Sequence, residues 1–194
     1  MRELIADLFI SLDGFASGVN EAAFFGHSGQ ELANWVSEQA DRPQLVLMGR
    51  VTYELLAGFS VHATDETSVR LTSLPKLVFS STLEEPLVWK NTRLAKGGVA
   101  EDIGALKQQR GDALRSIGSI SLVKSMMQLG LVDRFRLMVF PLILGSAGRE
   151  PIFAAYGRTS LKLMDTTVLD STLTLLEYRP AQGTMSSEPR HGAR

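Results

Sequence analysis

Short apolar runs alternate with amphipathic, helix-like segments over the first two thirds of the chain, and this alternation constrains the fold most. Glycine or small polar residues follow most of these runs, which is typical of strand ends and turns. Short strands joined by helices pack into a mostly parallel sheet with helices on its faces. The predicted strands are residues 4–11, 45–48, 76–79, 89–95 and 113–117, and the predicted helices are residues 28–39, 51–57, 100–109 and 119–129.

The last third of the chain changes to a pattern of strands. Apolar residues alternate with other residues over 134–140, and residues 161–169 and 171–178 read as two more strands with a turn at Asp170-Ser171. A terminal hairpin of this kind adds antiparallel strands at one edge of a sheet. Two interpretations of residues 134–140 stay open. Their alternating side chains face the core on one side and solvent on the other, or they pack on a twin subunit.

We therefore predict an α/β fold with three layers: a mostly parallel central sheet, antiparallel C-terminal strands, and helices on both faces. The domain is predicted to span residues 1–179. Residues 180–194 are rich in glycine, serine, proline and charge, have no apolar period, and are predicted to be a disordered tail. Two long connections, residues 15–26 and 62–73, are predicted to be loops, and the first is a candidate binding loop or lid.

Composition narrows the class of partner. The 194 residues carry 20 basic and 21 acidic side chains, a net charge of -1, so no electrostatic footprint for nucleic acid or an anionic membrane is present. A small-molecule partner fits better. The absence of cysteine excludes disulfides, thiolate zinc sites and a cysteine nucleophile. The N-terminus lacks a signal-peptide pattern, and no apolar run approaches the roughly 18 residues of a membrane span. We expect a cytoplasmic protein.

The three histidines, His27, His62 and His191, are widely scattered along the chain. Their spacing matches no metal-ligand pattern, so no metal site is predicted. Each is interpreted as a surface or loop residue.

Gly118-Ser119 lies between a predicted strand and a predicted helix. A strand that turns directly into a helix leaves backbone N–H groups facing outward beside the positive end of the helix dipole, which suits a phosphate. Gly118 leaves room for the anion, and Ser119 can act as N-cap and hydroxyl donor. The alternative is plain turn and cap chemistry, which needs no ligand.

Other turns at strand ends have similar composition. Asp13-Gly14, Gly49-Arg50 and the run Ser80-Ser81-Thr82 each follow a predicted strand, where ligands bind in open parallel sheets. Two of the turns open helices, so a diphosphate bridging two helix N-termini is the simplest hypothesis. Arg50 adds a fork-shaped charge for a further phosphate or for stacking on an adenine. The dinucleotide fingerprint G-x-G-x-x-G and the Walker pattern are both absent.

Six short motifs, in order over residues 2–178, carry a family resemblance. They are SLDGFA at 11–16, MGRVTYE at 48–54, VFSSTL at 78–83, IGS at 117–119, GLVD at 130–133 and FPLILG at 140–145. With them the chain resembles the dihydrofolate-reductase-like family. It is most similar to stand-alone proteins like the C-terminal reductase domain of the bifunctional riboflavin-biosynthesis deaminase-reductase.

The resemblance implies an NADPH site and a homodimer. It implies that Gly49, Arg50, Thr52, Ser80, Ser81 and Thr82 surround the adenosine 2′-phosphate, that Gly118, Ser119, Ile120 and Leu122 hold the diphosphate, and that Asp13, Gly14 and Ala16 lie by the nicotinamide. From the residues alone, NADPH is not distinguished from another dinucleotide or a flavin.

Two carboxylates are candidates for the catalytic acid. Glu31-Leu32-Ala33 resembles the acid-Leu-Ala segment of dihydrofolate reductases, and a carboxylate beside apolar groups can relay a proton. Glu31 is equally explained as the third helical residue of a capping box that starts at Ser28. Asp13 is the second candidate, and simple Asp-Gly turn chemistry is its alternative.

The activity implied is an NADPH-dependent reductase that transfers a hydride to a pyrimidine-like or pterin-like heterocycle. Residues 28–42 lack the Ser-x-Trp-Ile-Thr pattern usual in riboflavin-pathway reductases, so the resemblance does not specify the substrate. The alternatives are a non-catalytic dinucleotide- or flavin-binding module or sensor, and a scaffold protein that binds no nucleotide.

Overall fold

An eight-stranded sheet forms the centre of the computed structural model, which describes residues 1–154 and 156–181. Its strands lie in the order β5-β4-β3-β6-β1-β7-β10-β9; those from β5 to β7 are parallel, and β10 runs antiparallel to both β7 and β9. The bounds are β1 Leu4–Ser11, β3 Gln44–Gly49, β4 Lys76–Phe79, β5 Thr92–Leu94, β6 Ala113–Ile117, β7 Arg134–Phe140, β9 Leu161–Leu169 and β10 Leu173–Pro180. The predicted α/β fold with antiparallel C-terminal strands is confirmed.

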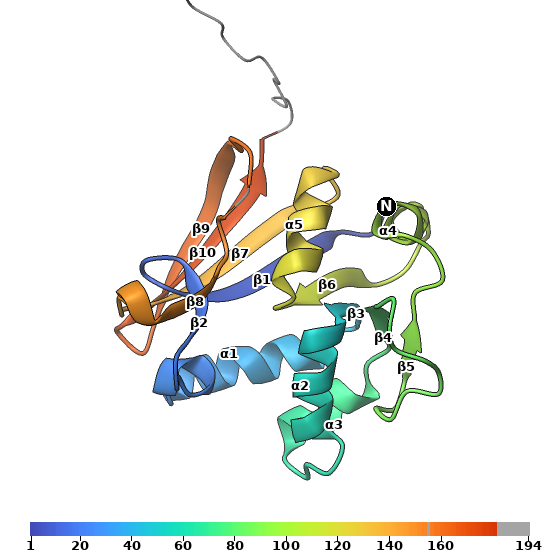
Figure 1. Ribbon diagram of the computed structural model, residues 1–194, viewed down its shortest axis with the longest axis horizontal. Coiled ribbons are helices and arrows are strands. Elements are labelled where there is room, and N and C mark those ends of the chain that lie inside the picture. The colour runs from blue at the N-terminus through green and yellow to red at the C-terminus, as the bar shows by residue number, and fades with distance from the viewer. Residues whose placement is uncertain (155, 182–194) are drawn as a thin grey trace, which may run out of the picture.

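Helices cover both faces of this sheet, as predicted. The side chains of α4 (Val99–Gln108) and α5 (Ile120–Gln128) pack on one face. Those of α1 (Gln30–Asp41), α2 (Arg50–Ser60) and α3 (Glu66–Ser73) pack on the other. Figure 1 shows the β9–β10 hairpin on the opposite side of the molecule from β5.

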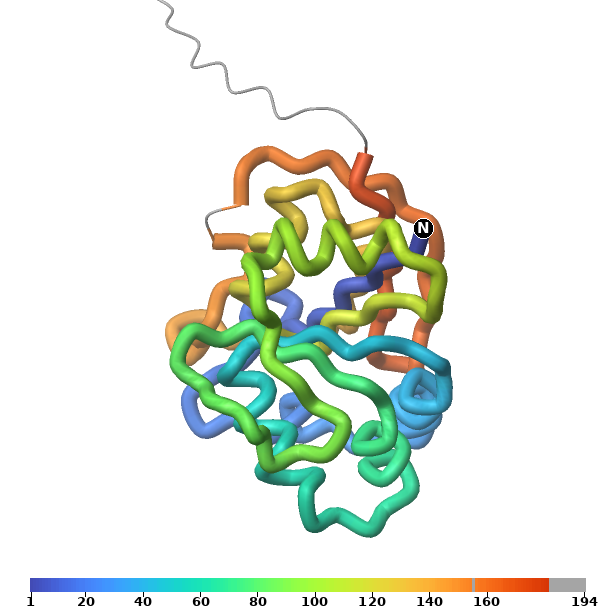
Figure 2. The backbone as a smooth tube through the Cα atoms, turned by 90° about the vertical axis from the view of Figure 1, so that its right-hand side faces the viewer, coloured from blue at the N-terminus to red at the C-terminus, as the bar shows by residue number. Residues whose placement is uncertain are grey.

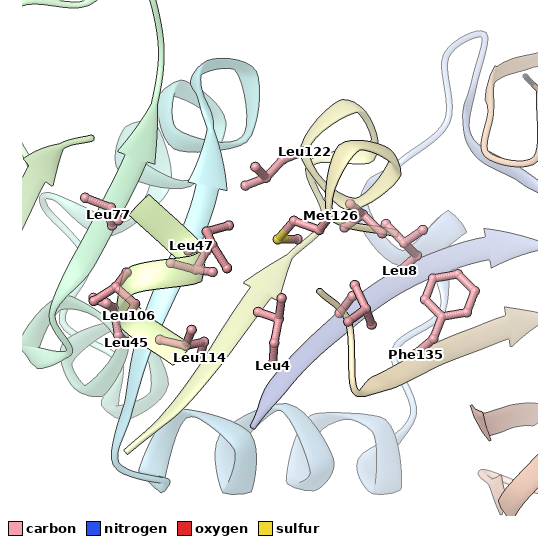
Figure 3. Packing of buried hydrophobic residues seen from close by; sticks show 14 of the residues in the cluster. Leu4, Leu8, Leu45, Leu47, Leu77, Leu106, Leu114, Leu122, Met126 and Phe135 are labelled. Carbon is pink, nitrogen blue, oxygen red and sulfur yellow. The ribbon is translucent and has the colours of Figure 1, made fainter. Parts of the chain in front are cut away.

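Strand alternation divides the core between the two faces. In β3, Leu45 and Leu47 belong to the cluster under α4 and α5, whereas Val46 and Met48 belong to the cluster under α2. Figure 3 shows Leu122 and Met126 of α5 directed toward the leucines of the sheet. Strands buried on both faces give near-continuous apolar runs in a sequence, which is why these runs predicted them.

The structure corrects two predicted loops and one predicted strand. Part of the predicted 62–73 loop is α3, which Asp65 caps by accepting a hydrogen bond from Ser68 N. This helix has only eight residues and none of them is fully buried, so its apolar signal in the sequence is weak. Only β5 remains of the predicted 89–95 strand, because Asn91 is left-handed (φ 58°).

Within the predicted 15–26 loop lie a short strand, β2 (Phe15–Gly18), and a 3-10 turn, η1 (Ala23–Gly26). β2 pairs with β8 (Gly148–Pro151), which follows a second 3-10 turn, η2 (Gly145–Ala147). Its partner lies more than 130 residues away, so no local pattern indicates this sheet.

The two ends of the described chain lie toward the same side of the molecule, as the tube view shows (Figure 2). Strand β10 extends through Pro180, and the N–H of Ala181 donates to the carbonyl of Ser160. The predicted disordered tail therefore begins at least two residues too early, and residues 182–194 lie outside the described residues. The alternation over 134–140 is internal, since β7 lies between β1 and β10 and its side chains are mostly buried.

A buried ionic cluster joins three neighbouring strands beneath α1. Asp7 of β1 accepts hydrogen bonds from Arg115 of β6 (2.5 Å) and from Arg136 of β7 (2.6 and 2.7 Å). The side chain of Asp7 is only 3% exposed. Burial alone would raise the pKa of Asp7, but the two guanidinium groups hold this pKa below its ordinary value.

Helix α1 closes this cluster from above. Gln39 accepts hydrogen bonds from both arginines, through its backbone carbonyl and its side-chain oxygen, and the ring of Trp35 lies 5.6 Å and 5.2 Å from the guanidinium carbons of Arg115 and Arg136. Two buried cations therefore share one carboxylate, one amide and one aromatic ring. The position of α1 over the sheet depends on these contacts.

The substitution Asp7→Asn should lower the free energy of unfolding by about 3–5 kcal/mol, because it leaves two buried guanidinium groups without a counter-charge. Urea unfolding followed by circular dichroism measures this loss. Glu66→Gln, which removes an exposed ion pair with Arg70, is the control and should change the free energy by less than about 0.5 kcal/mol. A loss below about 1 kcal/mol in Asp7→Asn would contradict the role given to the cluster.

Candidate functional site

The strand order brings the predicted turns into one row along the carboxyl edge of the sheet. Strands β4, β3, β6 and β1 are consecutive neighbours, and each ends at, or within two residues before, the turns at Ser80, Gly49, Gly118 and Asp13. Neighbouring strands lie about 4.8 Å apart, so these turns span roughly 14 Å. Four segments scattered over more than 100 residues of sequence thus form one continuous surface.

Ser119 joins the two helix N-termini at the centre of this row. Its Oγ accepts a hydrogen bond from the N–H of Gly49 (2.9 Å) and donates to Thr52 Oγ1 (2.8 Å). Ser119 itself is left-handed (φ 58°), so its hydroxyl points away from its own helix toward α2. The predicted N-cap position is correct, but the hydroxyl ties α5 to α2 and does not cap α5.

The first turns of α2 and α5 keep their N–H groups available. Neither N-cap residue places a side-chain acceptor on its helix, and no other side chain of the described residues accepts from these first-turn groups. A Cβ added at Gly118 would meet only Thr52 at 3.7 Å, and one added at Gly49 only Ser119 at 3.9 Å, so space outside both turns is open. The donor set and the open backbone fit a diphosphate.

The other residues predicted around the dinucleotide differ in how they are held. Arg50 is 45% exposed and forms an ion pair with Glu54 one turn along α2 (2.7 Å). Ser80 Oγ accepts from the N–H groups of Thr82 and Leu83 and so organises its own turn. The exposed residues of this turn that can meet a ligand are Ser81 and Thr82.

Within α5, the predicted residues Ile120 and Leu122 play unequal parts. The Leu122 side chain is buried in the core, so only its backbone N–H can serve a ligand. The Ile120 side chain packs on the edge of the same core and is partly exposed.

Asp13 anchors the loop after β1. Its carboxylate accepts hydrogen bonds from Ser11 Oγ (2.7 Å) and from the N–H groups of Leu144 (3.1 Å) and Gly145 (2.8 Å). The bond from Ser11, followed by that from Gly145, lowers the pKa of Asp13. Gly14 has a positive φ of 84° and packs against Phe153, and Ala16 lies in β2. Asp13 is therefore held ionised within a hydrogen-bonded turn.

Glu31 lies on the first turn of α1, but the predicted capping box from Ser28 does not form. The N-cap residue is Gly29, and the cap comes from Asp170, whose carboxylate accepts from the N–H of Glu31 (2.8 Å) and of Leu32 (3.1 Å). Glu31 in turn accepts from the N–H of Asp170. The reciprocal geometry of a capping box is present, with its two halves 139 residues apart in the chain.

His27 also binds the carboxylate of Asp170. Its Nε2 lies 3.0 Å from Asp170 Oδ2, and this hydrogen bond is the largest cause of the lowered pKa of Asp170. His27 lines a cavity of about 310 Å³ beyond the end of β7, together with Phe25, Gly26, Phe140, Pro141 and Leu142. Sequence reasoning assigned His27 no role, because its partner comes from a hairpin turn 143 residues away.

The described residues contain neither a metal-binding cluster nor a membrane-spanning helix. Residues 1–154 and 156–181 contain no group of three or more histidine and acidic side chains placed to hold a metal ion. In the same part of the chain, no helix has the length and hydropathy required to cross a bilayer.

Comparison with known proteins identifies the family. Residues 2–175 match the RibD C-terminal domain family. One relative, uncharacterized protein YyaP of Bacillus subtilis (strain 168), is 27% identical over 183 residues, which covers 91% of this chain and 94% of that protein. The resemblance found in the sequence to the riboflavin-pathway reductase domain is confirmed.

Solved structures agree on the fold. A putative riboflavin biosynthesis protein from Shewanella sp. PV-4 superposes with a TM-score of 0.68 at 21% identity, covering 93% of this chain and 99% of that one. Dihydrofolate reductase from Enterococcus faecalis, solved in complex with NADP(H), gives a TM-score of 0.61 at 12% identity, covering 92% and 96%. The dihydrofolate-reductase-like fold predicted from the six motifs is confirmed.

Gly29→Ala should destabilise the protein by about 1–3 kcal/mol, because the new Cβ would lie 1.9 Å from Asp170 Oδ2 and displace the cap of α1. Gly58→Ala is the matched control. Nothing lies within 4 Å of a Cβ at that helical position, so this change should stabilise by about 0.5–1 kcal/mol. Thermal unfolding of both variants measures the difference, and similar effects would show that Asp170 does not cap the helix.

Proposed function

This chain belongs to the RibD C-terminal domain family, and from that premise we propose that it is an NADPH-dependent reductase of a heterocyclic small molecule. The observation that carries the proposal is the junction of Gly49, Thr52 and Ser119, which holds two uncapped helix N-termini side by side. Two such termini offer several N–H donors and two positive dipole ends to one diphosphate. The NADP(H) bound by the Enterococcus faecalis relative, which shares this fold, supports the choice of cofactor.

The row of turns supports one orientation of the cofactor along the sheet edge. We call the junction of Gly49, Thr52 and Ser119 the diphosphate seat. On the side of this seat toward β4, Arg50, Ser81 and Thr82 offer a cation and two hydroxyls for the adenosine 2′-phosphate, and Arg50 can exchange its exposed partner Glu54 for a phosphate. On the other side, Asp13, Gly14 and Ala16 follow β1, which is the neighbour of β7, and Asp13 binds the segment after β7 through Leu144 and Gly145. The nicotinamide end therefore belongs beside β1, and the substrate beside β7.

The bound cofactor would supply the hydride for reduction of a carbon–nitrogen or carbon–oxygen double bond. The protein's residues then hold the two rings and provide a proton. Asp13 and Glu31 remain the acids predicted from the sequence, but backbone N–H groups already bind both carboxylates. These contacts favour Asp13 and Glu31 as positioning residues in this conformation.

The alternative function, a dinucleotide- or flavin-binding module without turnover, shares the diphosphate seat and differs only in chemistry. A homodimer and a cytoplasmic location also remain predictions. For the homodimer, edge strand β9 offers the exposed apolar side chains Leu163, Met164 and Val168 as a contact surface.

Ser119→Asp should weaken NADPH binding at least about 10-fold relative to Ser119→Asn, because the added charge repels a diphosphate at the helix N-terminus. Both replacements tolerate the left-handed backbone, have nearly the same size and lose the hydroxyl, so the pair differs chiefly in charge and in the donor N–H groups of the amide. Isothermal titration calorimetry with NADPH measures the ratio. Equal affinities would remove the diphosphate from this junction.

Arg50→Ala should reduce affinity for NADPH by about 10- to 100-fold and leave NADH binding nearly unchanged, because a charge-assisted contact to the 2′-phosphate is lost. Glu54→Gln breaks the same ion pair but keeps the Arg50 charge, so it should bind NADPH at least as well as the wild type. Equal losses for both cofactors in Arg50→Ala would contradict the 2′-phosphate assignment.

A further inference from the structure

We propose that His27, oriented by Asp170, is the catalytic residue that donates the proton to a heterocycle bound in the cavity at the end of β7. This inference rests on the proposed reductase function and names the group that this function still lacks. The His27–Asp170 pair combines with an aromatic cavity beside the expected nicotinamide position.

The cavity suits a planar ring. The Phe140 ring is buried, and its centroid lies 5.1 Å from that of Phe25 and 6.1 Å from that of His27. The aromatic rings that are partly exposed toward the cavity are therefore those of Phe25 and His27. The cavity also adjoins the exit of β1, because the N–H of Leu12 donates to the carbonyl of Leu142 (2.8 Å), one of its lining residues. A substrate ring here would lie one strand from the predicted nicotinamide position.

Asp170 determines which imidazole nitrogen is free. An ionised carboxylate only accepts hydrogen bonds, so His27 Nε2 must carry the hydrogen in the 3.0 Å contact with Asp170. The Nδ1 atom is then the nitrogen that gains and loses a proton. A carboxylate that fixes the tautomer in this way also stabilises the imidazolium form, which is the form a proton donor needs.

The pair is held firmly. Asp170 accepts two N–H groups of α1 and is bound in return by Glu31, and Gly29 leaves the space that its carboxylate fills. On the other side, Phe24 and Phe25 adopt left-handed backbone angles (φ 52° and 51°), which bulky residues keep only when their surroundings require it. The loop that carries His27 is thus positioned from both ends.

The protonation step balances with hydride transfer. In reduction of a C=N bond, the hydride forms the new C–H bond, the π electrons move to nitrogen, and His27 Nδ1–H supplies the proton of the new N–H bond. The substrate is reduced and the nicotinamide is oxidised. The side chain of His27 is 23% exposed, so the neutral imidazole can regain its proton from water.

Charged groups around His27 come from two elements: Asp170 of the β9–β10 turn and, bonded to it, Glu31 of α1. β7 contributes the uncharged ring of Phe140.

The test uses the full chain, NADPH, and a panel of two heterocycles with a reducible C=N bond, 7,8-dihydropterin and pteridine-2,4-dione. His27→Gln retains an amide that can donate to Asp170 but has no titrating proton. It should bind NADPH like the wild type and lower kcat at least about 100-fold with little change in KM. Ser28→Ala, at the exposed neighbouring residue, should behave as the wild type.

The outcomes separate the two proposals. Failure of the wild type to bind NADPH would reject the proposed function, whatever His27 does. NADPH binding with wild-type turnover that His27→Gln preserves would overturn the role of His27 alone. If no panel compound turns over, histidine-selected NMR of the NADPH complex decides: a ring resonance shift assigned to His27 on adding a panel compound supports the cavity, and no shift with any of them rejects it.

Discussion

The buried carboxylate of Asp7 is the constraint on which the rest of the site depends. It binds the guanidinium groups of β6 and β7, and α1 closes over all three strands through Gln39 and Trp35. The backbone carbonyl of Asp7 also accepts the N–H of Gly118 (3.1 Å). Asp7 therefore holds β6 and β7 in position against β1. The carboxyl ends of these strands border the diphosphate seat and the cavity.

The helices differ in whether a side chain caps their N-terminus, and the difference follows their position in the fold. Helix α3, at the periphery, is capped by its own neighbour Asp65, and α1 is capped by the distant Asp170. The helices α2 and α5 lack a side-chain cap from their N-cap residues, although serine and threonine hydroxyls lie beside them. Those hydroxyls bind each other and Gly49, which orders the two termini and leaves their N–H groups to a ligand.

Much of the fold was predictable because its strands are short, apolar and buried on both faces, as in the run from Leu45 to Met48. The failures have two causes. Helix α3 is only eight residues long and has no fully buried residue, so its apolar signal is weak, and the pairing of β2 with β8 joins segments that are far apart in sequence. Patterns in a sequence report local burial, and these elements depend on caps, ion pairs and distant partners.

The sequence by itself determined most strands of the main sheet, most helices, the family resemblance and the turns at Gly49 and Gly118, because local burial and glycine geometry specify them. Only the tertiary structure decided what the polar side chains do. It directed the hydroxyl of Ser119 to the neighbouring helix, replaced the expected cap of Ser28 with Asp170, and joined that carboxylate to His27. Each partner comes from a distant segment, so folding alone brings these groups within hydrogen-bonding distance.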